Sequence, residues 1–304
     1  MSHPANLPLP GSLVCWWLAA RPKTLFAAIN PVVLGTVLAF TSGALHWGAA
    51  LAALFGALAI QVGTNLANDY WDWKKGADTA ERLGPVRVTS AGLLPPQAVF
   101  RATWLSFGIA AILGAYLIAR GGWPIAIIGL VSIACGFLYT AGPVSLAYLG
   151  LGDLFTLIFF GPVACAGTYY VQTLAWSPVA MAAGLALGCF TVALIAVNNL
   201  RDRAQDAEKN KRTLAVRFGA RFARWEYSLA VTLPLLLPVI AVGLGWVASG
   251  FLAVSLLNVR AVVLARKIFS LPEGRELNGM LGATSGCAML YTLTFAVCWI
   301  LFQR

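Results

Sequence analysis

Long apolar stretches alternate with short polar ones along almost the whole chain. Stretches of about 20 apolar residues, enough to cross a bilayer as a helix, can be placed nine times in the sequence. Helices are predicted because an open strand would leave backbone groups without partners in lipid. The pattern therefore predicts an all-α polytopic membrane protein with about nine transmembrane helices. The predicted spans are 23–42, 48–68, 99–119, 123–142, 153–173, 178–199, 227–247, 249–266 and 280–301.

Composition and charge support this interpretation. The chain has 304 residues, of which 60% are hydrophobic and 11% charged, and its mean hydropathy of +0.79 excludes a soluble domain. With the N-terminus inside, nineteen of the twenty-one Lys and Arg residues fall in inner segments, and Arg120 and Arg304 remain outside. The net charge of +10 then reflects topology and an anionic inner leaflet rather than a nucleic-acid partner. All eleven acids also fall on the inner side, which the topology rule does not require and which indicates a site.

The first twenty residues do not have the pattern of a secretory signal, because no charged segment precedes a long apolar run. The run Cys15-Trp16-Trp17 favours an amphipathic interfacial segment over residues 1–20, at the start of a single transmembrane domain that covers residues 1–304. The six cysteines lie singly in apolar surroundings and the chain has two histidines, so zinc and haem sites are not expected.

Two polar clusters follow the second and sixth predicted spans. Asn68 and Asp72 form an Asn-x-x-x-Asp pattern, and Asn198 and Asp202 repeat it 130 residues later. On a helix, positions i and i+4 share a face. The spacing suggests an internal duplication that brings the two clusters face to face. Seven of the eleven acids lie in or beside these clusters: Asp69, Asp72, Asp78, Glu81, Asp202, Asp206 and Glu208.

Carboxylates gathered near a membrane surface, with Lys and Arg among them, suit Mg²⁺ together with a diphosphate. Hard Mg²⁺ takes carboxylate, amide and phosphate oxygens, and Asn68 and Asn198 could coordinate without adding charge. Lys and Arg would stabilise the diphosphate as it leaves, while an apolar cavity would hold a hydrocarbon tail. The alternative is that both clusters are solvated loops with i,i+4 ion pairs, which the repetition of the pattern makes less favourable.

The chain resembles the UbiA-type superfamily of intramembrane prenyltransferases, and most closely its 1,4-dihydroxy-2-naphthoate polyprenyltransferase branch. The blocks that carry this resemblance run in order from about residue 20 to residue 220, and together they are highly specific. They are Ala20-Arg21-Pro22-Lys23-Thr24, Gly63-Thr-Asn65-Leu-Ala-Asn68-Asp69-Tyr70, Gly84-Pro85-Val-Arg87-Val-Thr89, Tyr139-Thr140-Ala-Gly142-Pro143, Gly150-Leu-Gly152-Asp153, Phe159-Phe160-Gly161, Asn198-Asn199-Leu-Arg201-Asp202 and Lys211-Arg212-Thr213.

The resemblance implies nine helices around a central cavity and two motifs that bind Mg²⁺ with the prenyl diphosphate. Asp69 lies inside the first motif but ranks lower as a ligand. In one departure from the wider superfamily, Asp78 follows Asp72 by six residues rather than four; in another, Leu146 stands near a position that is often basic. The implied metal ligands are Asn68, Asp72, Asp78, Asn198, Asp202 and Asp206.

The implied reaction transfers a polyprenyl group from an all-trans polyprenyl diphosphate to 1,4-dihydroxy-2-naphthoate, with loss of carbon dioxide and diphosphate, and gives demethylmenaquinol. Asp72, Asp202 and Tyr139 are the expected catalytic residues. Asp153 either caps a helix or binds the acceptor. The remaining expected substrate-binding residues, together with Asn68 and Asp153, are Asn65, Arg21, Lys75, Arg82, Arg87, Asn199, Lys211 and Arg212.

Three alternatives stay open. A phytyl donor or a 4-hydroxybenzoate acceptor would keep the enzyme class, whereas an ion-coupled transporter would use its acids to carry ions. Transporters place such acids near the bilayer midplane, and here the acids cluster at one face. The expected location is the bacterial plasma membrane, in contact with lipid, with the active site and the N-terminus facing the cytoplasm. The sequence gives neither the tail length nor the oligomeric state.

Overall fold

The chain folds almost entirely into helices, in a computed structural model that describes residues 7–76, 83–141 and 145–303. These residues contain no β-strand, apart from an isolated bridge between Val247 and Gln303, so the all-α prediction is confirmed. The α-helices in chain order are α1 (Leu13–Ala20), α2 (Pro22–Thr41), α3 (Trp47–Lys74), α4 (Pro96–Gly121), α5 (Trp123–Leu138), α6 (Gly152–Ile158), α7 (Ala164–Thr173), α8 (Pro178–Arg201), α9 (Arg203–Glu208), α10 (Leu214–Thr232), α11 (Leu236–Gly243), α12 (Ala253–Leu257), α13 (Arg260–Ser270) and α14 (Asn278–Phe302).

Proline and capping residues determine where several helices begin or change pitch. Pro22 and Pro178 occupy the first positions of α2 and α8, where a missing N–H leaves no bond unmade. The Ser177 side chain caps α8 by accepting a hydrogen bond from the backbone N–H of Ala180 (3.2 Å). A π-helical turn over Phe159–Val163, which contains a proline, joins α6 to α7. Short 3₁₀ turns cover Leu233–Leu235, Ser249–Leu252 and Arg275–Leu277.

Seven helical segments in the described part of the chain are long and apolar enough to cross a membrane. The short α5 has 16 residues, and the eighth predicted span is broken into a 3₁₀ turn, α12 and α13. The predicted number of nine is therefore approximate. The seven segments are Pro22–Thr41, Trp47–Lys74, Pro96–Gly121, Gly152–Thr173, Pro178–Arg201, Leu214–Gly243 and Arg275–Phe302.

Two predicted boundaries are wrong in an instructive way. The span predicted from residue 227 begins at Leu214, because four charged residues lower the hydropathy of its first turns without preventing a helix. Arg224, one of them, donates hydrogen bonds to two backbone carbonyls at the end of α13. Glu226, which the sequence places in an inner loop, consequently lies within the long helix. The second span, predicted to end at residue 68, continues to Lys74, so the first polar cluster is helical.

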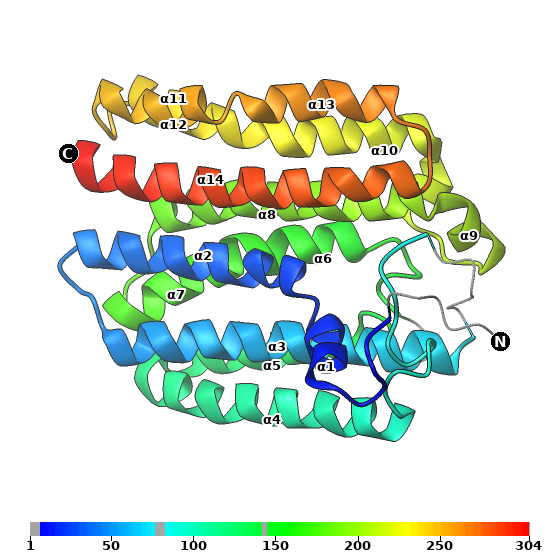
Figure 1. The fold of residues 1–304 in the computed structure, drawn as a ribbon. Helices are drawn as coiled ribbons and strands as arrows, with labels where there is room; N and C mark the ends of the chain where they lie inside the picture. Colours follow the sequence, from blue (N-terminus) through cyan, green and yellow to red (C-terminus); the bar gives the residue numbers. More distant parts are fainter. Residues whose placement is uncertain (1–6, 77–82, 142–144, 304) are drawn as a thin grey trace.

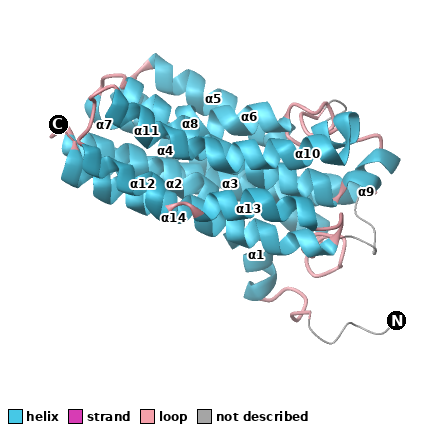
Figure 2. Ribbon diagram, turned by 90° about the horizontal axis from the view of Figure 1, so that it is seen from above, coloured by secondary structure: helices cyan, strands magenta, loops and turns pink. Residues whose placement is uncertain are grey.

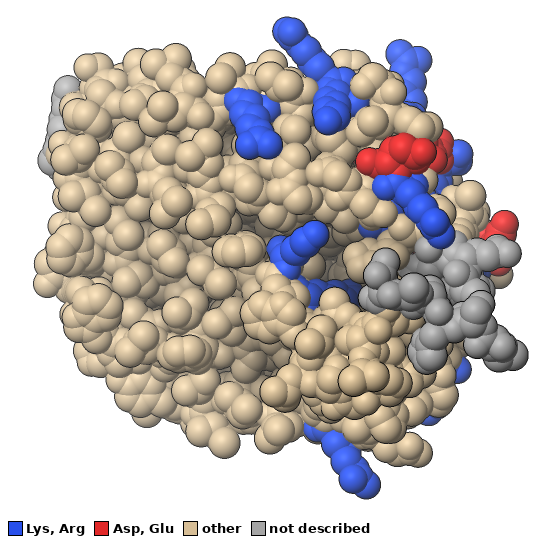
Figure 3. Space-filling view, in the orientation of Figure 1, with Lys and Arg blue, Asp and Glu red and all other residues tan. Residues whose placement is uncertain are grey.

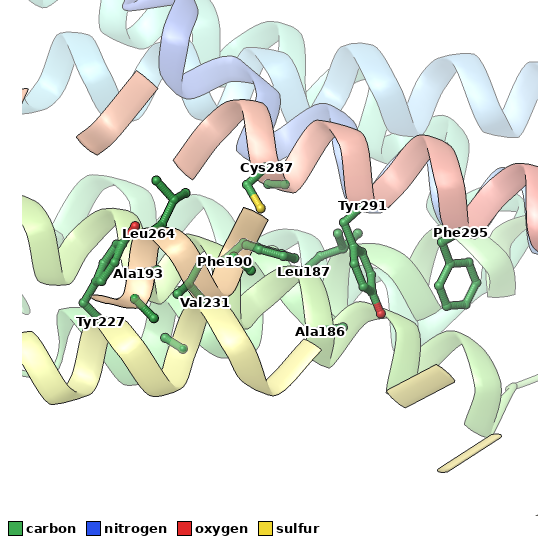
Figure 4. Packing of buried hydrophobic residues seen from close by; sticks show 14 of the residues in the cluster. Ala186, Leu187, Phe190, Ala193, Tyr227, Val231, Leu264, Cys287, Tyr291 and Phe295 are labelled. Atoms are coloured by element: carbon green, nitrogen blue, oxygen red, sulfur yellow. The ribbon is translucent and has the colours of Figure 1, made fainter. Parts of the chain in front are cut away.

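The core lies between α8, α10 and α14, where Phe190, Tyr227 and Tyr291 are fully buried (Figure 4). The two tyrosine hydroxyls have partners: that of Tyr227 bonds the Thr284 hydroxyl (2.9 Å), and that of Tyr291 donates to a backbone carbonyl. Glycines allow α8 to approach α6 and the π-helical turn closely. A Cβ at Gly184 would lie 2.7 Å from the carbonyl oxygen of the glycine at position 161.

The long helices run side by side, so the ends of α3 and α8 lie at the same end of the bundle as α9 (Figures 1 and 2). We call this end the charged end. On the face shown in Figure 3, Lys, Arg, Asp and Glu side chains gather toward it, and the described surface at the opposite end of that face carries none. Helix α1 packs against α3 and leaves Leu13 and Trp17 exposed. The interfacial role of this segment stays a prediction.

Candidate active site

The last turns of α3 hold the first polar cluster. Asn68 and Asp69 are buried, and Asp72 follows one turn later. The Asn68 Oδ1 atom accepts a hydrogen bond of 2.6 Å from the Thr140 hydroxyl, which attaches the segment after α5 to the cluster. The Asp72 Oδ2 atom accepts a hydrogen bond of 2.9 Å from Arg87 Nη2, and both side chains are largely buried. This cluster is therefore built from three separate segments of the chain.

Asp69 has a different task from Asp72. Its Oδ1 atom accepts a hydrogen bond from the backbone N–H of Thr89 (2.9 Å), and its Oδ2 atom accepts one from the backbone N–H of Val88 (3.2 Å). Since Asp69 is only 1% exposed, both carboxylate oxygens are used to hold the segment that carries Arg87. The lower rank given to Asp69 as a metal ligand agrees with this geometry.

Asn65 supports the turn that contains Arg21. Its Nδ2 atom donates to the carbonyl oxygen of Ala20 (2.9 Å) and to the Thr24 hydroxyl (3.0 Å). Arg21 itself joins α1 to α2 with φ at +52°, a left-handed conformation that is uncommon for arginine. The Asn65 amide thus bonds the backbone before Arg21 and the side chain of Thr24 after it, and the Thr24 hydroxyl in turn donates to the Arg21 carbonyl (2.9 Å).

Lys75, the first residue after α3, turns toward the segment that follows α5. Its Nζ atom donates to the carbonyl oxygen of Thr140 (2.7 Å) and lies 4.7 Å from the centre of the Tyr148 ring, in a cation–π contact. Burial lowers the pKa of Lys75, while the nearby Asp72 carboxylate raises it. Lys75 therefore lies beside both Asp72 and the Tyr139–Tyr148 segment.

The second cluster begins at the end of α8. Arg201 forms a two-pronged ion pair with Asp202, with Nε to Oδ1 at 2.8 Å and Nη2 to Oδ2 at 2.7 Å. In α9, Asp206 is 7% exposed and its Oδ1 atom pairs with Lys211 Nζ at 3.3 Å. Burial raises the pKa of Asp206, and the charge of Lys211 partly offsets that increase. Its Oδ2 atom is buried without a hydrogen-bond partner.

Tyr139 interacts electrostatically with carboxylates of both clusters. Burial raises the pKa of its phenol, and the negative charges of Asp153, Asp206 and Asp72 raise the pKa further. These three carboxylates come from different helices, and each is close enough to act on the same hydroxyl. The expectation that the two clusters face one another is consistent with this arrangement.

Asp153 is not the capping residue of α6. The cap position is Leu151, which makes no side-chain capping bond, and Asp153 lies inside the first turn. Its Oδ1 atom is buried without a hydrogen-bond partner, and the acceptor role of Asp153 stays a prediction. Glu226 of α10 interacts electrostatically with Asp153 and also has a buried oxygen without a partner.

The segment between α5 and α6 pairs with the segment after α9. The backbone N–H of Arg212 donates to the Tyr148 carbonyl (3.1 Å), and Arg217 Nη2 donates to the Leu149 carbonyl (2.8 Å). The Arg212 side chain itself is exposed, so its backbone makes this contact. The pairing therefore attaches the residue next to Lys211 to the segment that follows α5.

Two of the predicted residues, Asp78 and Arg82, lie outside the described residues. Asn198 and Asn199 are half-buried at the end of α8, and the Asn198 amide donates to the Leu194 carbonyl within that helix (3.1 Å). Asp72, Lys75, Asp202 and Asp206 lie at the ends of α3 and α8 and in α9, which meet at the charged end.

Sequence reasoning missed three residues that organise this site. Thr140 stands beside the predicted Tyr139, and Arg201 stands beside the predicted Asp202, so both were within reach of the motif. Asn278, at the start of α14, accepts a hydrogen bond from Arg201 Nη1 (2.8 Å). It lies far beyond the motif blocks, and no sequence signal marks it.

The donor atoms of the two clusters suit a hard cation. They are carboxylate and amide oxygens, and the unpartnered Oδ2 atom of Asp206 offers a further one. The described residues include no group of three or more His, Cys, Asp or Glu that could hold a metal ion by itself. Mg²⁺ is commonly bound by one or two carboxylates plus substrate phosphates, so the clusters fit Mg²⁺ that is shared with a diphosphate.

Comparison with known proteins gives consistent matches along the chain. Residues 28–281 match the UbiA prenyltransferase family. The chain is 38% identical over 287 residues to the 1,4-dihydroxy-2-naphthoate octaprenyltransferase of Mycobacterium tuberculosis, covering 94% of this chain and 96% of that protein. The enzyme of the same name from Escherichia coli is 36% identical over 215 residues, covering 69% of this chain and 70% of that protein.

Solved structures share the fold. A UbiA homolog from Archaeoglobus fulgidus bound to GPP and Mg²⁺ superposes with a TM-score of 0.66 at 15% identity, covering 93% of this chain and 99% of that one. The structure of the same homolog bound to DMAPP and Mg²⁺ gives a TM-score of 0.64 at 13% identity, covering 93% of this chain and 99% of that one. The family match spans most of the chain, and the chain belongs to the UbiA prenyltransferase family.

Proposed function

We propose that this protein transfers a polyprenyl group from an all-trans polyprenyl diphosphate to 1,4-dihydroxy-2-naphthoate, giving demethylmenaquinol for menaquinone synthesis. The observation that carries the proposal is the 38% identity, over 94% of the chain, to a 1,4-dihydroxy-2-naphthoate octaprenyltransferase. The two carboxylate clusters at one end of an apolar bundle supply the chemistry that such a reaction requires. A transporter is disfavoured because the chain belongs to a prenyltransferase family.

Two groups of oxygen donors would hold Mg²⁺: Asn68 and Asp72 at the end of α3, and Asn198, Asp202 and Asp206 at the end of α8 and in α9. Asp78, which lies outside the described residues, remains a predicted ligand. Bound Mg²⁺ would neutralise the charge of the diphosphate and polarise its bond to the prenyl carbon.

Basic residues stand next to the predicted ligands and can receive the leaving diphosphate. Arg87 pairs with Asp72, and Lys211 pairs with Asp206, so each cation already lies within about 4 Å of a carboxylate expected to bind metal. A guanidinium can hold two phosphate oxygens at once, whereas an ammonium acts as a compact point charge. Lys75, close to Asp72, adds a third positive charge.

Tyr139 can donate a hydrogen bond to a diphosphate oxygen. A phenol with the ordinary pKa of about 10 keeps its proton at neutral pH, so a negatively charged oxygen beside it would be bound as an acceptor. The reaction then breaks the bond between the prenyl carbon and oxygen, and the electron pair leaves with the diphosphate. An allylic cation remains in a dry, apolar environment.

The acceptor ring supplies the electron pair for the new carbon–carbon bond, at the carbon that bears the carboxyl group. The bond to that carboxyl group then breaks, its electron pair restores the aromatic ring, and carbon dioxide and the carboxyl proton are lost. Asp153, buried and with an unpartnered oxygen, accepts a hydrogen bond from an acceptor hydroxyl and so orients the ring.

The charged end faces the cytoplasm of the bacterial plasma membrane, and the N-terminus is inside. This proposal is supported by the basic residues, which concentrate toward the charged end (Figure 3). The integral membrane character follows from the seven long apolar helices in the described residues.

An assay in detergent tests the proposed reaction. Purified protein is incubated with 1,4-dihydroxy-2-naphthoate, prenyl diphosphates of several lengths and Mg²⁺, with and without EDTA. We expect prenylated naphthoquinol that requires Mg²⁺, with one preferred tail length. A product formed with 4-hydroxybenzoate or a phytyl donor instead would change the substrates. No turnover of any prenyl diphosphate by folded protein would overturn the proposal.

A further inference from the structure

A buried arginine connects the second polar cluster to the last helix of the chain. Arg201 is 3% exposed, and all three guanidinium nitrogens have partners. Nε and Nη2 bind the Asp202 carboxylate, and Nη1 donates to Asn278 Oδ1 at 2.8 Å. Because a buried charge is costly unless it is paired and hydrogen-bonded, these three bonds favour one position of the side chain.

Asn278 extends the connection to the first cluster. Its Nδ2 atom donates to the backbone carbonyl of Leu83 at 3.0 Å, across 195 positions of sequence. The next residue, Gly84, lies directly on the guanidinium: a Cβ at this position would be 2.8 Å from Arg201 Nη2. Residues 83–90 therefore begin in contact with the Arg201–Asn278 pair, through Leu83 and Gly84.

The other end of residues 83–90 is held by the first cluster. Asp69 accepts the backbone N–H groups of Val88 and Thr89. Between the two attachments, Arg87 reaches Asp72. The segment is thus fixed at both ends, with the residue expected to bind diphosphate between them.

We propose that Arg201 and Asn278 are positioning residues that couple the two metal-binding clusters through α14. They hold residues 83–90 so that Arg87 faces the diphosphate when the second cluster is in place. This inference rests on the proposed function, and it assigns a task to α14, to which the sequence motifs give none. Loss of the Asn278 side chain should loosen residues 83–90 and weaken binding of the prenyl diphosphate, while binding of the aromatic acceptor stays unchanged.

Hydrogen exchange followed by mass spectrometry tests the structural part without any turnover. In Asn278→Ala we expect amides in peptides covering residues 83–90 to exchange about fivefold faster or more, since a local attachment is lost. Peptides from α4 should be unchanged. Asn258→Ala is the matched control, because it removes an asparagine that also makes two hydrogen bonds, to Val254 and Thr294, far from the site. Equal exchange in both variants would overturn the proposal.

Steady-state kinetics tests the functional part. We expect Asn278→Ala to raise KM for the prenyl diphosphate about tenfold, the size of one lost hydrogen bond to a charged group. KM for the acceptor should stay within about twofold, as should both constants in the Asn258→Ala control. Equal changes in both KM values, or a fall in kcat alone, would indicate general damage and contradict a positioning role.

A second variant, in residues 83–90 themselves, tests the same contact with the Arg201–Asn278 pair. Gly84→Ala places a methyl group against the Arg201 guanidinium, at a backbone position that does not have a positive φ. It should reproduce the selective rise in KM for the prenyl diphosphate even if Asn278→Ala folds poorly. An unchanged KM would count against the proposal that Arg201 and Asn278 position residues 83–90. If wild-type protein turns over no prenyl diphosphate, the proposed function fails, whereas the exchange experiment still decides whether Asn278 holds residues 83–90 in place.

Discussion

The two polar clusters share the sequence pattern Asn-x-x-x-Asp but are built in different ways. In the first, the cation that pairs with Asp72 comes from Arg87, fifteen residues later, in a segment held by hydrogen bonds to Asp69. In the second, the cation that pairs with Asp202 is its own neighbour, Arg201, which is buried against α14. The same pattern therefore produces one cluster whose partner belongs to a loop and one whose partner belongs to a helix.

We expect this difference to give the two arginines different tasks: Arg201 stabilises the fold of the second cluster, and Arg87 serves substrate binding in the first. A neighbouring arginine in a buried helix end keeps one geometry, because each of its three guanidinium nitrogens makes a hydrogen bond, two to Asp202 and one to Asn278. An arginine in a loop can change partners with less cost, because the backbone attachments of residues 83–90 stay in place and only the Arg87 side chain has to move. We expect the second cluster to be the fixed half of the site and the first to be the half that adjusts to the diphosphate.

The largest effect is expected when either carboxylate is neutralised. Asp72→Asn and Asp202→Asn should each lower kcat/KM by about a thousandfold, because each removes a charge that is expected to hold Mg²⁺ at the reacting diphosphate. Steady-state assays at several Mg²⁺ concentrations measure this. Glu273→Gln is the control, since Glu273 pairs with Arg203 at the surface and its loss should leave activity unchanged. A comparable fall in the control would show that the loss is not specific to the site.

The next comparison is between the two arginines. Arg201→Met should lower the free energy of unfolding by about 3 kcal/mol, because Asp202 is left without its buried partner. Arg87→Met should raise KM for the prenyl diphosphate about tenfold, the size of one lost charged hydrogen bond, as loss of the positioning residue Arg201 also should, but with a smaller change in thermal stability. Melting temperatures in detergent and KM values for both substrates distinguish the two results. If Arg87→Met proved the more destabilising variant, the assignment of a fixed and an adjustable half would be reversed.

Asp69→Asn tests the attachment of the loop. An asparagine has one acceptor oxygen where the carboxylate has two, so one of the backbone N–H groups of Val88 and Thr89 loses its partner. The cost of such a buried donor is about 1–3 kcal/mol. We expect KM for the prenyl diphosphate to rise severalfold while the Mg²⁺ concentration at half-maximal activity stays constant. A shift in the Mg²⁺ requirement like that of Asp72→Asn would instead make Asp69 a metal ligand.

Much of the fold could be predicted because hydropathy is a strong signal in membrane helices. The starts of α2, α4 and α8 lie within three residues of the predicted spans. The start of α10 could not be found this way, because Arg217, Arg221 and Arg224 make its first turns look like a loop. Their helix is stabilised by tertiary contacts, such as the bonds from Arg224 to the end of α13, and hydropathy does not report such contacts.

The site was predictable as far as its motifs extend. Asp72 and Asp202 are marked by acidic spacing and by resemblance, and Tyr139 by resemblance. The structure places an arginine beside each of the two carboxylates, and the catalytic roles of the three residues stay predictions. Asn278 was not predictable, because a single asparagine at the start of an apolar helix can be explained without any functional role. Its importance lies in its contacts with Arg201 and Leu83, which only the folded chain brings together.

The smallest effect is expected at Lys211, where the second cluster meets solvent. Its bond to Asp206 is 3.3 Å long, and the lysine side chain is 27% exposed, so water and salt screen the pair more than the buried pairs around Arg87 and Arg201. Lys211→Met should raise KM for the prenyl diphosphate only two- to threefold, and about as much as high salt does in the wild type. Measuring KM between low and high ionic strength checks this. A tenfold rise that salt cannot mimic would mean that the ammonium contacts the diphosphate in a dry site, and the second cluster would then also have an adjustable partner.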